Sequence, residues 1–220
     1  MLRWVALSAL FVACASPQSS EIAPSPTPSP AQTSPSPTAI SALQSIAAQP
    51  GDFPGSLTTC SWSADFGTYA NSVKVTDPEL AQQMLDLWQR SQSGGATAGW
   101  VQDLSVSEDA CKGFYGGSAG LVRHVTCIVV MFKDRESAAN AYSTNKNVFG
   151  LFSRGKLEGA PTETGTSTGL GPNSIVVAPN NLPTLAAAWQ KNAYYVLFIA
   201  IGNSLSDEKL ALGKIDARIP

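Results

Sequence analysis

The chain has 220 residues, with 14 lysines and arginines against 16 aspartates and glutamates, which gives a formal net charge of −2. No segment concentrates lysine and arginine, and this excludes the basic surface through which proteins bind nucleic-acid phosphates. The sequence has a single histidine and no Cys-X-X-Cys pair, so it lacks the usual ligand sets of zinc sites. We expect neither a metal nor another cofactor.

Residues 1–13 have the pattern of an export signal. Arg3 supplies a positive charge, and the residues that follow it are apolar apart from Ser8. This run is too short to cross a bilayer as a helix, which takes about twenty residues. It ends in LFVAC, residues 10–14, which resembles the lipobox of bacterial lipoproteins. The resemblance implies that Cys14 carries lipid and holds the protein at the membrane, on its extracytoplasmic face. The alternative is a plain signal peptide with an incidental cysteine.

Residues 14–50 are interpreted as the lipid anchor followed by a tether. Residues 17–50 contain eight of the fifteen prolines, are otherwise dominated by Ser, Thr and Ala, and carry Glu21 as their only charge. Such a composition cannot bury enough apolar surface to offset the entropy lost on ordering. The stretch APSPTPSPAQTSPSPTA is typical of an extended spacer.

After the spacer, apolar β-branched runs alternate with signals for the start of a helix. A short helix is expected over 42–48, and Asp77-Pro78 predicts a longer one over 78–93, because Asp is a good N-cap and Pro fits the first turn. Further helices are expected to begin at Asp134 and Ser204. Strands are expected over 58–62, 71–75, 100–106, 124–132, 174–178, 185–190 and 193–202.

The order of these elements indicates the fold class. The runs 174–178 and 185–190 flank PNNLP, a turn signal that predicts a β-hairpin. Strands that follow one another without an intervening helix favour an α+β fold over a parallel α/β fold. We therefore expect a single globular α+β domain over 51–220, with a mostly antiparallel sheet and about three helices packed on one face.

Two acidic pairs and one glycine pair are interpreted as structural. Glu108-Asp109 and Asp207-Glu208 lie near the predicted starts of elements, where negative charge favours a helix N-terminus. The segment Gly169-Leu170-Gly171 lacks the helix and acidic residue expected after a dinucleotide-binding loop. It is interpreted as a tight turn that leads into the strand over 174–178.

Once Cys14 carries lipid, the domain retains three cysteines, Cys60, Cys111 and Cys127. Export to an oxidising compartment favours a disulfide between two of them. Cys127 lies in VTCIVVM, a buried-strand pattern in which a free cysteine behaves as a small hydrophobic residue. We therefore predict a disulfide between Cys60 and Cys111, with a bond between Cys111 and Cys127 as the alternative.

One motif has a catalytic pattern. Residues 116–120 read GGSAG, with Ser118 at the position of the nucleophile in a serine-hydrolase elbow. That chemistry needs a histidine base and a carboxylate, and the one histidine, His124, lies within a predicted strand. Because a strand follows instead of the helix that the elbow requires, we interpret GGSAG as a glycine-rich turn. His124 is expected on the polar face of its strand together with Thr126.

Four further segments, LTTCSW, IVVMFKDRESAANAY, TGLGPNSIVV and AWQKNAYYVLFIAIGN, resemble bacterial lipoproteins with tethered α/β envelope domains. More loosely, the glycine turn, strand, hairpin and closing helix are similar to actinobacterial envelope lipoproteins and to the extracellular sensor domains of receptor Ser/Thr kinases. These families imply binding of a ligand or partner and no established catalysis.

Together these observations predict a membrane-tethered extracytoplasmic lipoprotein whose domain binds an unknown small-molecule or protein ligand of the envelope and is not an enzyme. The aromatic residues Trp100, Phe114 and Tyr115 are candidate ligand contacts, with ordinary core packing as the alternative. Two alternative functions are a structural or assembly factor of the envelope and a serine hydrolase that uses Ser118.

Overall fold

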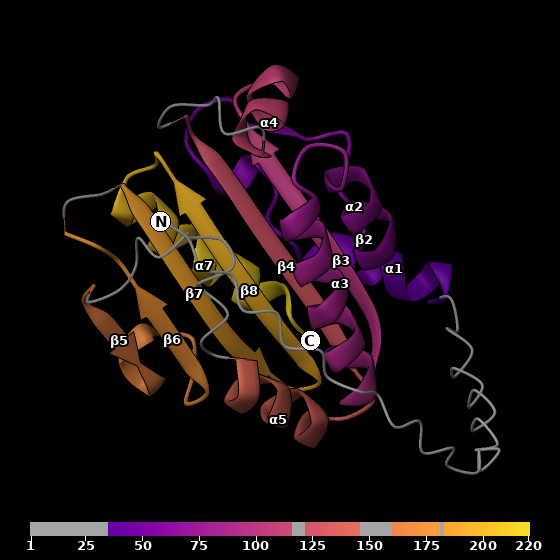
Figure 1. Ribbon diagram of the computed structural model, residues 1–220. Coiled ribbons are helices and arrows are strands. Elements are labelled where there is room, and N and C mark those ends of the chain that lie inside the picture. Colours follow the sequence, from indigo (N-terminus) through magenta and orange to yellow (C-terminus); the bar gives the residue numbers. More distant parts are fainter. Residues whose placement is uncertain (1–34, 116–121, 146–159, 181–182) are drawn as a thin grey trace, which may run out of the picture. The chain divides into compact units, whose positions relative to one another are not determined.

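The computed structural model describes residues 35–115, 122–145, 160–180 and 183–220. Within these ranges the chain forms an eight-stranded antiparallel sheet with helices on both faces (Figure 1). The strands are β1 (Thr58–Thr59), β2 (Ala64–Asp65), β3 (Ala96–Ser105), β4 (His124–Phe132), β5 (Thr162–Thr164), β6 (Ser174–Val177), β7 (Thr184–Lys191) and β8 (Tyr194–Ile201). The helices are α1 (Pro37–Ile46), α2 (Phe66–Val73), α3 (Pro78–Ser93), α4 (Glu108–Tyr115), α5 (Arg135–Asn145) and α7 (Leu205–Arg218), with short 3-10 turns η1 (Pro50–Asp52) and η2 (Gly165–Thr168).

The strands run in the order β1-β3-β4-β8-β7-β6-β5, and β2 pairs with β3 beside β1. The longest pairings join β3 to β4, β4 to β8 and β7 to β8. The predicted hairpin is confirmed, because β6 and β7 pair with Val177 opposite Ala186. The expected α+β class and the antiparallel sheet are therefore both confirmed.

The helices cover both faces of the sheet, so the prediction of about three helices on one face is wrong. On β4, Val125, Cys127 and Val129 belong to one core with α1 and α7, whereas Ile128 and Val130 belong to a second core with α2, α3 and α5. Figure 1 shows α2 and α3 crossing one face, with α1 and α7 on the other. Burial on both faces explains why β4 is an almost continuous apolar run.

Three of the predicted helices begin at the residues that their caps indicated. The Asp134 carboxylate accepts a hydrogen bond from the Ser137 backbone N–H at 2.7 Å and caps α5. The Asp77 carboxylate accepts a hydrogen bond from the Leu80 backbone N–H at 3.0 Å and caps α3. The Ser204 hydroxyl accepts one from the Asp207 backbone N–H at 3.2 Å and caps α7. Side-chain caps of this kind satisfy N–H groups that have no partner within the helix. The expected starts of all three helices are confirmed.

The strand expected over 71–75 is wrong, because this segment contains the end of α2 and the turn after it. The Asp65 carboxylate accepts hydrogen bonds from the N–H groups of Gly67 and Thr68 and starts the helix. The residues that α2 buries recur at helical spacing, and they are Phe66, Tyr69, Ala70 and Val73. Beyond the helix, the side chain of Val75 is 88% exposed. Val75 therefore belongs neither to a strand nor to the core, although its β-branched side chain favours a strand.

The folded unit also begins earlier than residue 51. The compact unit spans Ser34–Pro220, and α1 places the fully buried Leu43 in the core that it shares with α7. Arg218 secures this contact, because its guanidinium donates hydrogen bonds to the carbonyls of Ile46 and Ala47. Residues 37–46 are thus part of the fold and not of the tether. Among the described residues, no helix combines the length and the apolar character needed to cross a membrane.

Candidate functional site

Antiparallel pairing of β3 with β4 brings polar side chains together at one end of the sheet. The register sets Asp103 opposite Thr126 and Ser105 opposite His124. Directly opposed residues have their side chains on the same face, and in this case it is the face covered by α2. The side chain of Tyr69 on α2 is fully buried and reaches this end of the sheet. Polar groups from three elements therefore meet inside the molecule.

The centre of this group is the carboxylate of Asp103, which is fully buried. One oxygen accepts hydrogen bonds from the Tyr69 hydroxyl at 2.8 Å and from the Trp62 indole N–H at 3.1 Å. The other accepts one from the Thr126 hydroxyl at 2.6 Å and lies 3.5 Å from Nε2 of His124. We call these five residues the Asp103 network. Because a buried carboxylate without donors is strongly unfavourable, this arrangement is what makes its burial tolerable.

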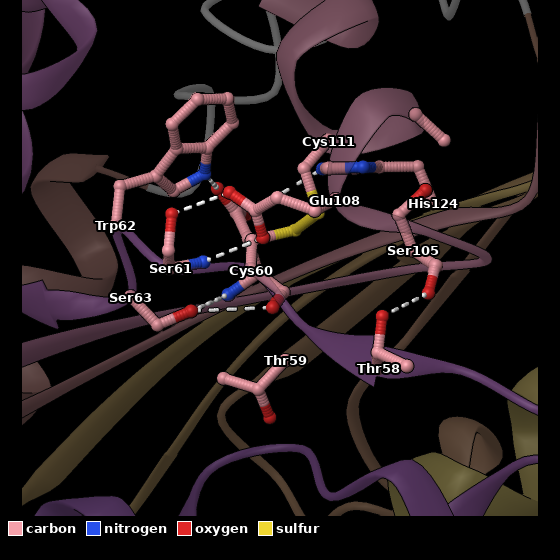
Figure 2. The surroundings of a disulfide bond; sticks show 12 residues. Thr58, Thr59, Cys60, Ser61, Trp62, Ser63, Ser105, Glu108, Cys111 and His124 are labelled. Carbon is pink, nitrogen blue, oxygen red and sulfur yellow. Dashed lines mark hydrogen bonds and ion pairs between the residues drawn. A yellow bond between two sulfur atoms is a disulfide. The ribbon is translucent and has the colours of Figure 1, made fainter.

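A disulfide ties the loop between β1 and β2 to α4. Cys60 and Cys111 are bonded, with their Cα atoms 5.8 Å apart, and Figure 2 shows the bond beside Ser61 and Glu108. The Glu108 carboxylate accepts hydrogen bonds from the hydroxyl of Ser61 and from its backbone N–H, and chiefly the hydroxyl bond lowers the pKa of Glu108. We call the loop 60–63 together with Glu108 and Cys111 the disulfide corner.

The disulfide corner and the Asp103 network share the backbone of Asp103. Its carbonyl accepts hydrogen bonds from the Cys60 N–H at 2.9 Å and from the Ser63 hydroxyl at 3.2 Å, and its N–H donates to the Ser63 hydroxyl oxygen at 2.9 Å. Trp62, which belongs to the network, also comes from this loop. The covalent and the hydrogen-bonded crosslinks therefore support each other.

Arg123 holds the neighbouring segments at the same end of the sheet. Its guanidinium donates to the Asn203 side-chain oxygen at 2.8 Å and to the Pro54 carbonyl at 2.6 Å. Its own carbonyl accepts a hydrogen bond from the Ser105 hydroxyl at 2.9 Å. At Gly202, where φ is +77°, an added Cβ would lie 3.1 Å from the Arg123 backbone. Close approach at this point thus requires glycine.

Two members of a hydrolase triad, an aspartate and a histidine, are adjacent in the Asp103 network. The side chain of His124 is, however, only 2% exposed, and its Nε2 atom faces Asp103 and the Thr126 hydroxyl, the latter at 3.2 Å. A general base has to reach the proton that it removes. This geometry favours a structural role for the pair, and it confirms that His124 shares the polar face of its strand with Thr126.

The structure locates some of the predicted site residues and does not describe others. The predicted Cys60–Cys111 disulfide is confirmed, and Cys127 is free and buried, where burial raises the pKa of its thiol to about 12. Trp100 is only 8% exposed and lies in the core with α1 and α7. Its indole N–H donates to Gln102 at 3.0 Å, so this tryptophan packs in the core. Cys14, Ser118 and the side chains of Phe114 and Tyr115 lie outside the described residues.

Sequence reasoning missed Trp62, Tyr69 and Asp103. Asp103 carries the clearest signal, since it is the one charged residue of β3. The second signal is the pair His124 and Thr126, which lie two residues apart on β4 and therefore point to the same face of the sheet. Tyr69 gives no such signal, because it lies in a helix that was not predicted and that overlaps the strand expected over 71–75.

Comparisons with known proteins give the following result. No protein-family model matches the sequence, and no curated protein matches it. Among solved structures, the chain is similar to the extracellular domain of PknH from Mycobacterium tuberculosis, with a TM-score of 0.36 and 13% sequence identity. The alignment covers 82% of this chain and 93% of that chain. A likeness at this level carries no argument about the site or the function.

Proposed function

We propose that the protein is a lipoprotein held at the extracytoplasmic face of the cell membrane through Cys14, with a domain that binds a small-molecule or protein ligand of the envelope and performs no catalysis. The export signal and the lipobox-like LFVAC segment support the anchor. The proline-rich stretch that follows supports a spacer between the anchor and the domain.

The observation that carries the proposal most strongly is the Cys60–Cys111 disulfide. Both cysteines are buried, at 1% and 0% exposure, and the bond fixes the loop that delivers Trp62 to Asp103. A structural disulfide of this kind forms and persists in oxidising compartments and is rare in the cytosol. The disulfide therefore supports the extracytoplasmic compartment that the N-terminal sequence predicts.

A binding role is supported by how the disulfide corner presents its exposed groups. Ser61 is exposed on the loop between β1 and β2, and nearby Val106, just after β3, is 42% exposed. Binding residues occur preferentially on loops that a rigid scaffold positions. In contrast, the acid and base of the Asp103 network are buried and hydrogen-bonded inside the protein. This contrast supports binding over hydrolysis.

Membrane fractionation of matched cysteine variants tests the anchor. The wild-type protein and a Cys127→Ala variant are expected to remain with washed membranes and to enter the detergent-rich phase. A Cys14→Ser variant is expected to be lost from both fractions, because one thioether-linked lipid carries the membrane affinity. Equal membrane retention of the wild type and Cys14→Ser would overturn the lipid anchor.

A further inference from the structure

Four of the six charged side chains of α7 are engaged by groups outside the helix. Lys209 forms an ion pair with Glu163 on β5 at 2.8 Å, and Asp216 forms one with Lys191 on β7 at 3.2 Å. Arg218 pairs with Asp52 of η1 at 2.7 Å, and Lys214 donates to the carbonyls of Gly51 and Asp52. These contacts fasten the helix along its length to three other elements.

Glu208 differs from all of these residues. Its side chain is 1% exposed, and it lies on the inward face of α7 with Ala211, Leu212 and Ile215, which also are buried. Its Oε1 atom has no hydrogen-bond partner. A carboxyl group in this position is more stable protonated than ionised, because burial removes most of the hydration of the charged form and Oε1 has no hydrogen-bond donor.

The elements packed against α7 supply no cation to Glu208 within the described part of the chain. α1 contains no charged residue. The cation of β7, Lys191, is bonded to Asp216, and Arg123, which precedes β4, donates to Asn203 and Pro54. The anions Asp52 and Glu163 are held by Arg218 and Lys209. Within its own helix the adjacent Asp207 is a further negative charge.

We propose that α7 is a proton-coupled latch, which docks on the sheet with Glu208 protonated and gives up one proton when it is released. The inference concerns the folded domain and does not depend on the membrane anchor. A latch of this kind loosens as the surroundings become more alkaline.

The direction follows from the two states of the carboxyl group. In the docked helix, burial and to a smaller extent the charge of Asp207 raise the pKa of Glu208 to about 8. In a released helix the side chain meets water and titrates at its ordinary value, near 4.3. Docking is therefore most favourable below the ordinary pKa and weakens as pH rises, until the docked carboxyl group is itself ionised.

Hydrogen exchange of the α7 amides in the full-length protein tests the proposal. The opening constant of α7 is compared between the wild type and Glu208→Gln, which removes the proton with little change of shape. The ratio of the two constants is expected to rise about tenfold per pH unit from about pH 5 to pH 8, which corresponds to one released proton. Glu136→Gln, an exposed glutamate in the first turn of α5, is the matched control and is expected to leave the α7 exchange unchanged.

A ratio that stays constant across this pH range would overturn the latch. A second measurement keeps the proposal testable if Glu208→Gln does not fold. The side-chain ¹³C carboxyl resonance of Glu208 in the wild-type protein is expected to titrate at least two units above an exposed glutamate, which ordinarily titrates near pH 4.3. Titration together with the exposed glutamates would overturn the proposal equally.

Discussion

The carboxylate of Asp103 is the residue on which the polar end of the sheet depends. It accepts hydrogen bonds from Tyr69, Trp62 and Thr126, and it lies near His124. Its donors come from a loop, a helix and the neighbouring strand. Loss of the acceptor would leave several buried donors unsatisfied at once, and this costs more than the loss of any one bond.

Replacement of Asp103 by asparagine tests this assignment. The amide keeps one acceptor oxygen but turns an NH₂ group toward neighbouring donors, so we expect the free energy of unfolding to fall by about 2–4 kcal/mol. Tyr69→Phe removes one donor only and is expected to cost about 1 kcal/mol. Urea unfolding measures both values. A loss for Asp103→Asn no larger than that for Tyr69→Phe would contradict the central role of the carboxylate.

The sequence allowed only part of this site to be predicted. His124 and Thr126 were recognisable because they alternate along a single strand, which is a local property. Their meeting with Asp103 depends on the register of β3 against β4, and register is a pairing property that neither strand encodes alone. The contact of Tyr69 with Asp103 could be predicted only if the segment around Tyr69 were recognised as a helix.

At the scale of elements, prediction succeeded where caps and periodicity agreed. The start of α3 was predicted from Asp77-Pro78, and β4 from its unbroken apolar run. α2 was missed, because it is only eight residues long and its β-branched end resembles a strand. α4 was also missed, and it too is only eight residues long.

The disulfide is expected to stabilise the attachment of α4 to the loop between β1 and β2. It joins residues 51 positions apart, for which the chain-entropy model gives about 4 kcal/mol. Combined Cys60→Ala and Cys111→Ala substitution should lower the free energy of unfolding by about this amount. Reductant should destabilise a Cys127→Ala variant to a similar degree and leave the double variant unaffected. A double variant as stable as the wild type would show that the bond adds nothing to the fold.

The packing of α2 and α3 on the sheet depends on Gly99 of β3. The rings of Phe66 and Trp88 stack over this position, with their centroids 5.2 Å apart. A Cβ at Gly99 would lie 2.9 Å from Phe66 and 3.0 Å from Trp88, so Gly99→Ala should cost about 1–3 kcal/mol through overpacking.

Gly213 provides the matched control for this substitution. It lies inside α7, and an added Cβ would meet nothing within 4 Å, so Gly213→Ala should stabilise the protein by about 0.5–1 kcal/mol. Thermal unfolding of the two variants measures both changes in stability. A Gly99→Ala variant as stable as the wild type would mean that the two rings move apart freely.

At the scale of the whole domain, the sheet is enclosed between two helical layers, and the layer of α1 and α7 begins in a segment whose composition resembled a spacer. Pro37 and its neighbours continue the proline-rich pattern, and only Leu43 and Ile46 mark the segment as part of the core. Because composition is averaged over a segment, it does not reveal the residue at which the spacer ends and the folded domain begins. The almost continuous apolar run of β4 is the sequence signal that both faces of the sheet are covered, since a strand with one solvent-facing side alternates apolar and polar residues.

Truncation of Leu43 tests whether α1 belongs to the folded domain. The side chain is fully buried, so Leu43→Ala should lower the free energy of unfolding by about 2–5 kcal/mol. The neighbouring Gln44 is exposed, and Gln44→Ala should change it by no more than about 0.5 kcal/mol. Equal stabilities for the two variants would show that α1 is part of the tether and not of the folded domain.

Mass spectrometry of the N-terminal peptide from the native, membrane-associated protein tests whether Cys14 is the lipid anchor. We expect a peptide that begins at Cys14 and carries acyl chains, the first pair joined to its sulfur through a glycerol thioether. A peptide that retains residues 1–13, or one in which the thiol of Cys14 is unmodified, would contradict the account.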